Sequence, residues 1–198
     1  MGRDETMAII ALIAVATAAA LYLSGPWWGA EVSLRQRRAA ALVTLAGSAA
    51  LGVLDPGKAL VAAPLLAILS VVAVVDQVHQ IIPNRWVGLL LAWGVWERWS
   101  NGHWLASLLA AVVIFVFYLM VHVVTHGGMG MGDVKFAGVL AFALGYPAGL
   151  VSMVAGIWAA GLYALMLVVR RKNVRTEKMP LGPFLALGGL IGFLDLLH

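Results

Sequence analysis

Residues 104–144 read WLASLLAAVVIFVFYLMVHVVTHGGMGMGDVKFAGVLAFAL, and this segment indicates the fold class of the chain. Trp104–Val124 is an unbroken apolar run of about the 20 residues that a helix needs to cross a bilayer core. A glycine-rich turn with one acid follows, and a second apolar run then begins. Of all 198 residues, 63% are hydrophobic and 11% are charged, against roughly 45–50% and about 25% in soluble domains. The sequence therefore predicts an all-α integral membrane protein.

Eight apolar runs are separated by Gly, Pro or charged clusters, and we expect each run to form a transmembrane helix. They are Met7–Leu23, Ala39–Leu54, Ala59–Val75, Trp86–Trp96, Trp104–Val124, Val134–Leu144, Gly149–Val169 and Leu181–Leu197. The polar start before the first run has too few basic residues for a typical signal peptide, so we expect an uncleaved helix, with cleavage as the alternative. Without a linker or an internal repeat, the chain is predicted to be a single membrane-embedded domain over residues 1–198.

The basic residues predict the orientation, because cytoplasmic loops are enriched in Lys and Arg. If the eight runs alternate across the membrane, ten of the thirteen basic residues fall on one side. The ten are Arg35, Arg37, Arg38, Arg85, Lys135, Arg170, Arg171, Lys172, Arg175 and Lys178, and the other three are Arg3, Lys58 and Arg98. We expect the ten to face the cytoplasm and both chain ends to lie outside. Because this charge pattern is a topology signal, the predicted partner is a lipid bilayer and no nucleic acid.

Two of the runs are short for a bilayer. Trp86–Trp96 and Val134–Leu144 are each about eleven residues, or about 16 Å of helix, against a hydrocarbon core of about 30 Å. Non-helical backbone at membrane depth is tolerated only where it lines a cavity or is buried in protein. We therefore expect a cleft in the bundle that faces the cytoplasm.

Two acids, Asp76 and Asp133, stand alone beside apolar runs. An acid at membrane depth is a candidate functional group, because it costs free energy unless it is protonated, paired or facing water. Asp133 follows Gly130 and Gly132, which permit close backbone approach, so the turn can bring the two acids together. The structural alternative is that Asp76 caps locally and Asp133 pairs with Lys135, although residues two apart on a helix do not face each other.

Two carboxyls held close together share a proton, because repulsion and desolvation raise the pKa of one of them. Such a pair can hydrolyse a peptide bond. The ionised carboxylate takes a proton from a water molecule while the protonated carboxyl polarises the carbonyl group. A second function fits the same acids, a proton- or cation-coupled transporter with the two carboxyls as ion sites.

Three segments resemble the motifs of one family, the type IV prepilin peptidases. They are DQVHQIIPNR at 76–85, GMGDVK at 130–135 and MPLGPFLALG at 179–188. The second segment looks like the GxGD motif of the family with its usual Val-Lys extension, and the third is similar to its C-terminal Pro-rich segment. A lone GxGD is weak evidence, but three motifs in this order within a membrane protein are specific.

The resemblance implies an aspartic endopeptidase of the prokaryotic cytoplasmic membrane, with Asp76 and Asp133 as its catalytic pair. Its substrates would be prepilins or pseudopilins, each with a short basic leader and an N-terminal transmembrane helix, cut at the cytoplasmic face. Eight further positions belong to the expected site. Gly130, Gly132 and Lys135 would form its loop, and Pro83, Asn84, Pro180, Gly182 and Pro183 would position the substrate.

The chain contains no cysteine, so we expect a short form without the cysteine zinc domain of long family members. Some members also methylate the new N-terminus, and S-adenosylmethionine is implied only if that activity is retained. Otherwise no cofactor is expected. His122 and His126 are spaced i,i+4, but no acid lies between them as in a zinc-protease helix, and we predict no metal site. The sequence does not predict the particular substrate or the oligomeric state.

Overall fold

The computed structural model describes residues 15, 19, 32–54, 56–170 and 179–195, and they form seven helices. Their bounds are α2 Leu34–Leu54, α3 Pro56–His79, α4 Asn84–Asn101, α5 Trp104–Val124, α6 Met131–Leu144, α7 Ala148–Val169 and α8 Gly182–Asp195. Within these ranges there is no strand, which agrees with the predicted all-α class. The predicted first helix, Met7–Leu23, lies outside the described residues apart from Val15 and Ala19.

Among the described residues, three helices are long and apolar enough to cross a membrane. They are Val61–His79 within α3, Trp104–Val124 and Ala148–Val169. In the last two, fewer than a quarter of the residues are buried inside the protein, as expected of helices that face lipid. The other predicted spans each correspond to a helix except the first, and the full count of eight transmembrane helices remains a prediction.

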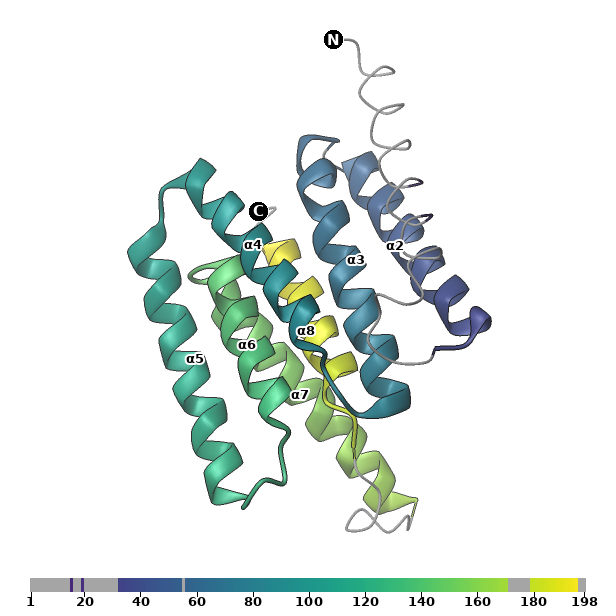
Figure 1. The fold of residues 1–198 in the computed structure, drawn as a ribbon, viewed down its shortest axis with the longest axis vertical. Coiled ribbons are helices and arrows are strands. Elements are labelled where there is room, and N and C mark those ends of the chain that lie inside the picture. Colours follow the sequence, from purple (N-terminus) through teal and green to yellow (C-terminus); the bar gives the residue numbers. More distant parts are fainter. Residues whose placement is uncertain (1–14, 16–18, 20–31, 55, 171–178, 196–198) are drawn as a thin grey trace.

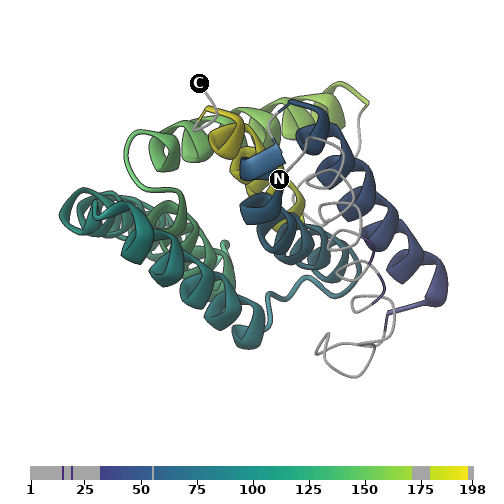
Figure 2. The same cartoon turned by 90° about the horizontal axis from the view of Figure 1, so that it is seen from above.

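The helices form an antiparallel bundle with α8 at its centre (Figure 1). α8 packs against α3 on one side and against α6 and α7 on the other, while α2 covers α3. α5 and α4 both pack on α6 and complete the opposite side of the bundle, as the view from above also shows (Figure 2). The C-terminal end of α3, the turn before α6 and the start of α8 all lie at the lower end in Figure 1. This arrangement gathers the three motif segments at one end of the bundle.

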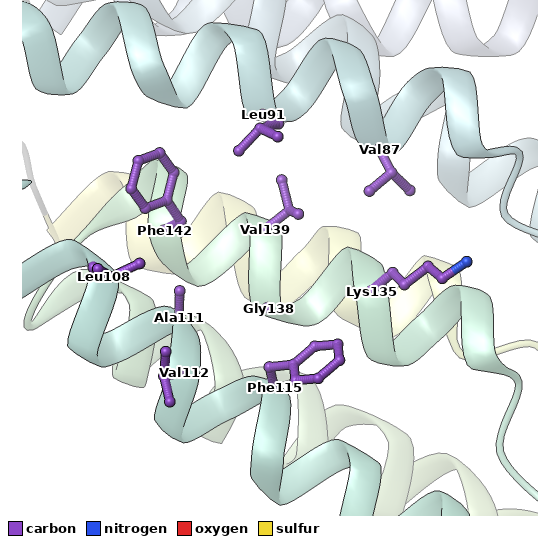
Figure 3. A pocket seen from close by; sticks show the side chains of 10 residues that line it. All are labelled: Val87, Leu91, Leu108, Ala111, Val112, Phe115, Lys135, Gly138, Val139 and Phe142. Carbon is purple, nitrogen blue, oxygen red and sulfur yellow. The ribbon is translucent and has the colours of Figure 1, made fainter.

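A groove of about 550 Å³ lies between α4, α5 and α6 on the outside of the bundle (Figure 3). We call it the α4–α6 groove. Its walls are almost entirely apolar, with Leu91 from α4, Phe115 from α5 and Val139 from α6, and Lys135 is its one charged lining residue. This groove is where the structure places the basic residue of the expected site loop.

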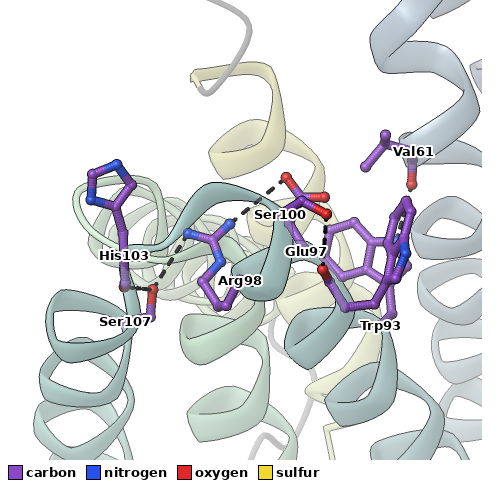
Figure 4. Close-up of polar contacts among 8 residues, drawn as sticks. Val61, Trp93, Glu97, Arg98, Ser100, His103 and Ser107 are labelled. Carbon is purple, nitrogen blue, oxygen red and sulfur yellow. Dashed lines mark hydrogen bonds and ion pairs between the residues drawn. The ribbon is translucent and has the colours of Figure 1, made fainter.

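α4 is longer than the eleven-residue helix expected from Trp86–Trp96, so that prediction was wrong. The helix continues through Glu97 and Arg98 because Arg98 is buried, with 5% of its surface exposed. Its guanidinium donates a hydrogen bond of 3.4 Å to Ser107 Oγ and lies 4.0 Å from the Glu97 carboxylate (Figure 4). Hydropathy underestimates the length of such a helix, because it does not register that the charged side chain is buried between helices.

α7 and α8 approach each other closely through small residues. A Cβ atom at Gly188 of α8 would lie 2.9 Å from the backbone nitrogen of Gly156 in α7. Small residues of this kind allow membrane helices to pack backbone to backbone. The close packing fixes the position of the α8 N-terminus, which carries the third motif.

Candidate active site

Asp76 lies in the last turn of α3 and is buried, with 3% of its surface exposed. α3 ends just beyond it, where the backbone N–H of Gln80 donates to the Asp76 carbonyl oxygen at 2.9 Å and Gln80 adopts a φ of 54°. The chain then turns away into the segment that leads to α4. The acid is therefore held on a regular helix at the edge of an irregular turn.

The Asp76 carboxylate receives a hydrogen bond from the start of α8. The backbone N–H of Gly182 donates to Asp76 Oδ2 at 2.6 Å. A Cβ atom at position 182 would lie 2.6 Å from Asp76 Cβ, which no ordinary packing contact tolerates. Gly182 was expected to position the substrate, and its observed contact is with the acid itself. The third motif thus reaches the site through its backbone.

Asp133 lies in the first turn of α6 and is 9% exposed. Gly130 precedes the helix as its N-terminal cap residue, and a Cβ atom there would lie 2.9 Å from Asp133 Oδ2. Oδ1 is buried and has no hydrogen-bond partner in the part of the chain that the structure describes. A buried carboxylate oxygen without a partner is costly. Oδ1 is therefore free to bind a water molecule or a substrate.

The two acids interact electrostatically although 57 positions separate them in the sequence. Asp133 lies outside the three membrane-crossing helices, and its pKa is raised to about 7 by burial first and by the negative charge of Asp76 second. Hydrogen bonds from the backbone N–H groups of Gly130 and of Asp133 itself act in the opposite direction. A raised pKa on one member of a carboxyl pair allows one proton to remain on the pair near neutral pH. Such a pair holds an acid and a base together.

Tyr118 is a site residue that the sequence analysis did not identify. It lies on α5, only 3% of its surface is exposed, and Asp133 is within electrostatic range of its phenol. A tyrosine inside an apolar run looks like any other core aromatic residue in the sequence. Its placement depends on the contact between α5 and α6, which the spacing of residues along one helix does not reveal.

The glycine-rich turn is held by a histidine side chain. His122 Nδ1 lies 2.6 Å from the Met129 carbonyl oxygen, and because a carbonyl only accepts, Nδ1 carries the proton. Gly127 takes a φ of 83°, a conformation that favours glycine. Gly132 packs on the segment after α3, since a Cβ atom there would lie 3.3 Å from Ile82 Cβ. The turn is therefore fastened both to α5 and to the segment that follows Asp76.

Lys135 does not share the environment of Asp133. Residues two apart on a helix point in nearly opposite directions, and Lys135 is exposed and lines the α4–α6 groove while Asp133 is buried. Figure 3 shows Lys135 at one end of the groove, with its ammonium group extending away from the other labelled side chains. This position favours a contact with lipid headgroups over an ion pair with the acids.

The remaining expected site residues lie at helix starts around the two acids. Pro83 is the N-terminal cap residue of α4 and Asn84 is exposed in its first turn. Pro180 precedes α8, and Pro183 follows Gly182 in its first turn. Their proposed contact with substrate stays a prediction. Within the described residues, no cluster of three His, Cys, Asp or Glu side chains is arranged to hold a metal ion.

A family comparison identifies the class of protein that this site belongs to. A model of the type IV leader peptidase family matches residues 63–165, just over half of the chain, so the chain belongs to that family. The matched range contains both Asp76 and Asp133 and ends before Gly182.

The chain is also similar to a protein of Bacillus subtilis (strain 168) named prepilin leader peptidase/N-methyltransferase. The two are 30% identical over 131 residues, which is 65% of this chain and 53% of the relative. The chain therefore spans about half the length of the curated relative that it matches. No solved structure matches the chain.

Proposed function

We propose that this protein is a multi-pass aspartic endopeptidase of a prokaryotic cytoplasmic membrane, and that Asp76 and Asp133 are its catalytic residues. Its substrates are prepilins or pseudopilins that carry a short leader before an N-terminal transmembrane helix. The cut falls at the cytoplasmic face, at the end of the bundle that holds the C-terminal end of α3, the turn before α6 and the start of α8. The family membership and the similarity to the Bacillus subtilis prepilin leader peptidase/N-methyltransferase support this proposal.

The chemistry follows from one proton shared by two carboxyls. A water molecule between them loses a proton to the ionised carboxylate and attacks the scissile carbonyl carbon. The protonated carboxyl donates its proton to the carbonyl oxygen, which gives a neutral tetrahedral intermediate. Collapse of the intermediate breaks the C–N bond as the leaving nitrogen takes a proton from one carboxyl. A hydroxyl group of the intermediate gives its proton to the other carboxylate, so the pair again holds one proton. The reaction needs no covalent intermediate and no cofactor.

One observation carries the proposal. Two acids that are at least nine-tenths buried sit within electrostatic range of each other, on separate helices at one end of the bundle. A buried acid weakens a membrane protein, so two in one place call for a functional reason. The N–H group of Gly182 binds Asp76 Oδ2, whereas Asp133 Oδ1 has no hydrogen-bond partner among the described residues. Asp133 Oδ1 can therefore accept a hydrogen bond from a water molecule.

A direct assay tests this function. The purified protein is incubated in detergent or vesicles with a prepilin that keeps its leader and its transmembrane helix, and the products are weighed by mass spectrometry. We expect two fragments whose masses add up to the substrate plus one water. An intact substrate after incubation with several prepilins, while the protein remains folded, would argue against the proposal. The transporter alternative gains no support from the family match.

A further inference from the structure

A second groove, of about 360 Å³, lies between α5, α7 and the start of α8. We call it the α5–α7 groove. Its lining includes Tyr118 of α5, Met129 of the glycine-rich turn, Gly161 of α7 and Leu181 before α8. Of the lining residues that the structure describes, none is charged. It differs in this respect from the α4–α6 groove, which has Lys135 in its wall.

Three lining residues connect this groove to the candidate active site. Tyr118 is within electrostatic range of Asp133. Met129 immediately precedes Gly130, which covers the Asp133 carboxylate, and Leu181 precedes Gly182, whose N–H group binds Asp76. The acids do not line the groove themselves, but one end of it lies next to residues that contact both of them. A peptide lying in the groove would therefore run toward the reacting atoms.

The inner end of the groove offers a polar group, the hydroxyl of Tyr118. Only 3% of the surface of Tyr118 is exposed, and the residue lines the groove. Its ring packs edge-on against Phe117, with ring centroids 5.6 Å apart, and its phenol is within electrostatic range of Asp133. A tyrosine hydroxyl can donate or accept a hydrogen bond. A peptide in the groove would offer it a partner.

The wall formed by α7 is open to a close approach. Gly156, Ala160 and Gly161 have little or no side chain, and a Cβ atom at Gly161 would meet nothing within 4 Å. Small residues let a second apolar segment approach a membrane helix closely. The wall therefore leaves room for an apolar peptide segment to pack against α7.

We propose that the α5–α7 groove binds the apolar residues of the substrate that follow the cut bond, with the Tyr118 hydroxyl hydrogen-bonded to the substrate backbone. The inference rests on the proposed function and adds the place where the substrate helix docks. A phospholipid fits the groove less well, because its phosphate group would approach the carboxylate of Asp133 and, among the described residues, no cation lines the groove. The α4–α6 groove with Lys135 suits a lipid better.

The test compares two substitutions that fill open space on different faces. Gly161→Leu places a side chain in the α5–α7 groove, and Gly88→Leu makes the same change on α4, where a Cβ atom also meets nothing within 4 Å. Each variant is assayed on a full prepilin and on a leader peptide that stops shortly after the cut. We expect Gly161→Leu to lower kcat/KM at least tenfold on the prepilin, mainly through KM, and to leave the short peptide unaffected. Gly88→Leu should change neither rate.

The outcomes separate this inference from the proposed function. If the wild-type protein cleaves prepilin and Gly161→Leu cleaves it equally well, the docking site is wrong and the peptidase function stands. If the wild-type protein cleaves neither substrate, the function itself fails. An equal loss on both substrates also contradicts the docking site, because it would indicate damage to the acids.

A crosslinking measurement keeps the inference testable should Gly161→Leu fail to fold. The native chain has no cysteine, so Gly161→Cys in an Asp133→Asn background carries a single thiol. Oxidation with prepilins that bear one cysteine in the apolar segment should give a disulfide-linked complex. Gly88→Cys is the matched control and should give none. A lipid in the groove would leave position 161 unlinked, and that result, or equal linking at both positions, contradicts the inference.

The Tyr118 hydroxyl is tested separately by Tyr118→Phe. Loss of one hydrogen bond to substrate should raise KM about five- to tenfold with little change in the melting temperature. Tyr163→Phe on α7 is the control, since Tyr163 packs its ring against Phe184 at a centroid distance of 5.3 Å and does not line the groove. Equal KM values in wild type and Tyr118→Phe would remove Tyr118 from the docking site.

Discussion

The backbone N–H of Gly182 donates a 2.6 Å hydrogen bond to Asp76 Oδ2 across 106 positions of the sequence. A backbone N–H on a carboxylate favours the ionised form and holds one oxygen in place. The bond also ties the start of α8 to the last turn of α3, so the position of the acid depends on how α8 packs. Since Gly182 has no side chain, this contact is open to a specific test.

Gly182→Ala should lower leader cleavage at least tenfold. The added methyl group would lie 2.6 Å from Asp76 Cβ and 2.9 Å from Asp76 Cγ, which forces α8 and the acid apart. Overpacking of this kind typically costs about 1–3 kcal/mol, so the melting temperature should fall as well. Gly88→Ala is the control, because its methyl group meets nothing within 4 Å. Wild-type cleavage by Gly182→Ala would mean that the Gly182 contact does not position Asp76.

The stability of the protein should depend on the protonation of Asp133. Its folded pKa of about 7 lies above the ordinary value of 3.8, so the folded state binds more protons than the unfolded state between these two values. The free energy of unfolding therefore falls as the pH rises from about 4 to about 7. Thermal unfolding in detergent across this range should show the slope in wild type and a smaller slope in Asp133→Asn. Identical slopes would place the titration elsewhere.

The rate of cleavage should follow a bell-shaped pH profile with its upper limb near pH 7. Activity needs one protonated and one ionised carboxyl, and the last proton leaves the pair as the pH passes the raised pKa. The apparent pKa values obtained from the profile belong to the pair of carboxyls rather than to one residue. The profile is obtained by measuring kcat/KM on one prepilin from about pH 4 to about pH 9. This range spans the ordinary and the raised pKa values of a carboxyl group. A rate that keeps rising above pH 8 would exclude the shared-proton mechanism.

The orientation predicted from the basic residues is tested by single cysteines. The two positions are Thr125, which follows α5 beside the glycine-rich turn, and Ser100, which lies near the C-terminal end of α4, away from the site. Both native side chains are exposed, and each is replaced by cysteine in a separate variant. A membrane-impermeant thiol reagent added to intact cells should label position 100 and spare position 125, because the site end faces the cytoplasm. The reverse pattern would overturn the orientation.

Much of the fold could be predicted because apolar runs and polar breaks determine where membrane helices begin and end. Trp104–Val124 was predicted with the same bounds as α5. α4 was underestimated because Arg98 is buried by contacts with other segments, among them Ser107 of α5, and hydropathy cannot register such a contact. The failure lies where tertiary packing overrides the local pattern.

The acids stood out in the sequence for an energetic reason, since isolated charges beside apolar runs are rare. Their mutual interaction needed the fold, because it depends on how α3 and α6 each pack against α8. The contact of Gly182 with Asp76 involves a backbone N–H group, which every residue except proline possesses, so no residue type signals it. Tyr118 was missed for the related reason that its role depends on its neighbours on other helices.

Single Asn variants of Asp76 and Asp133 show whether the two acids act together to cut the leader. Asn keeps the shape of the side chain and removes the buried charge, so both variants should insert and fold. Wild-type and variant proteins are incubated with the same prepilin, and the products are measured by mass spectrometry. We expect no cleavage by Asp76→Asn or by Asp133→Asn, and a double variant no worse than either single one. Cleavage at a near wild-type rate by either single variant would contradict the account.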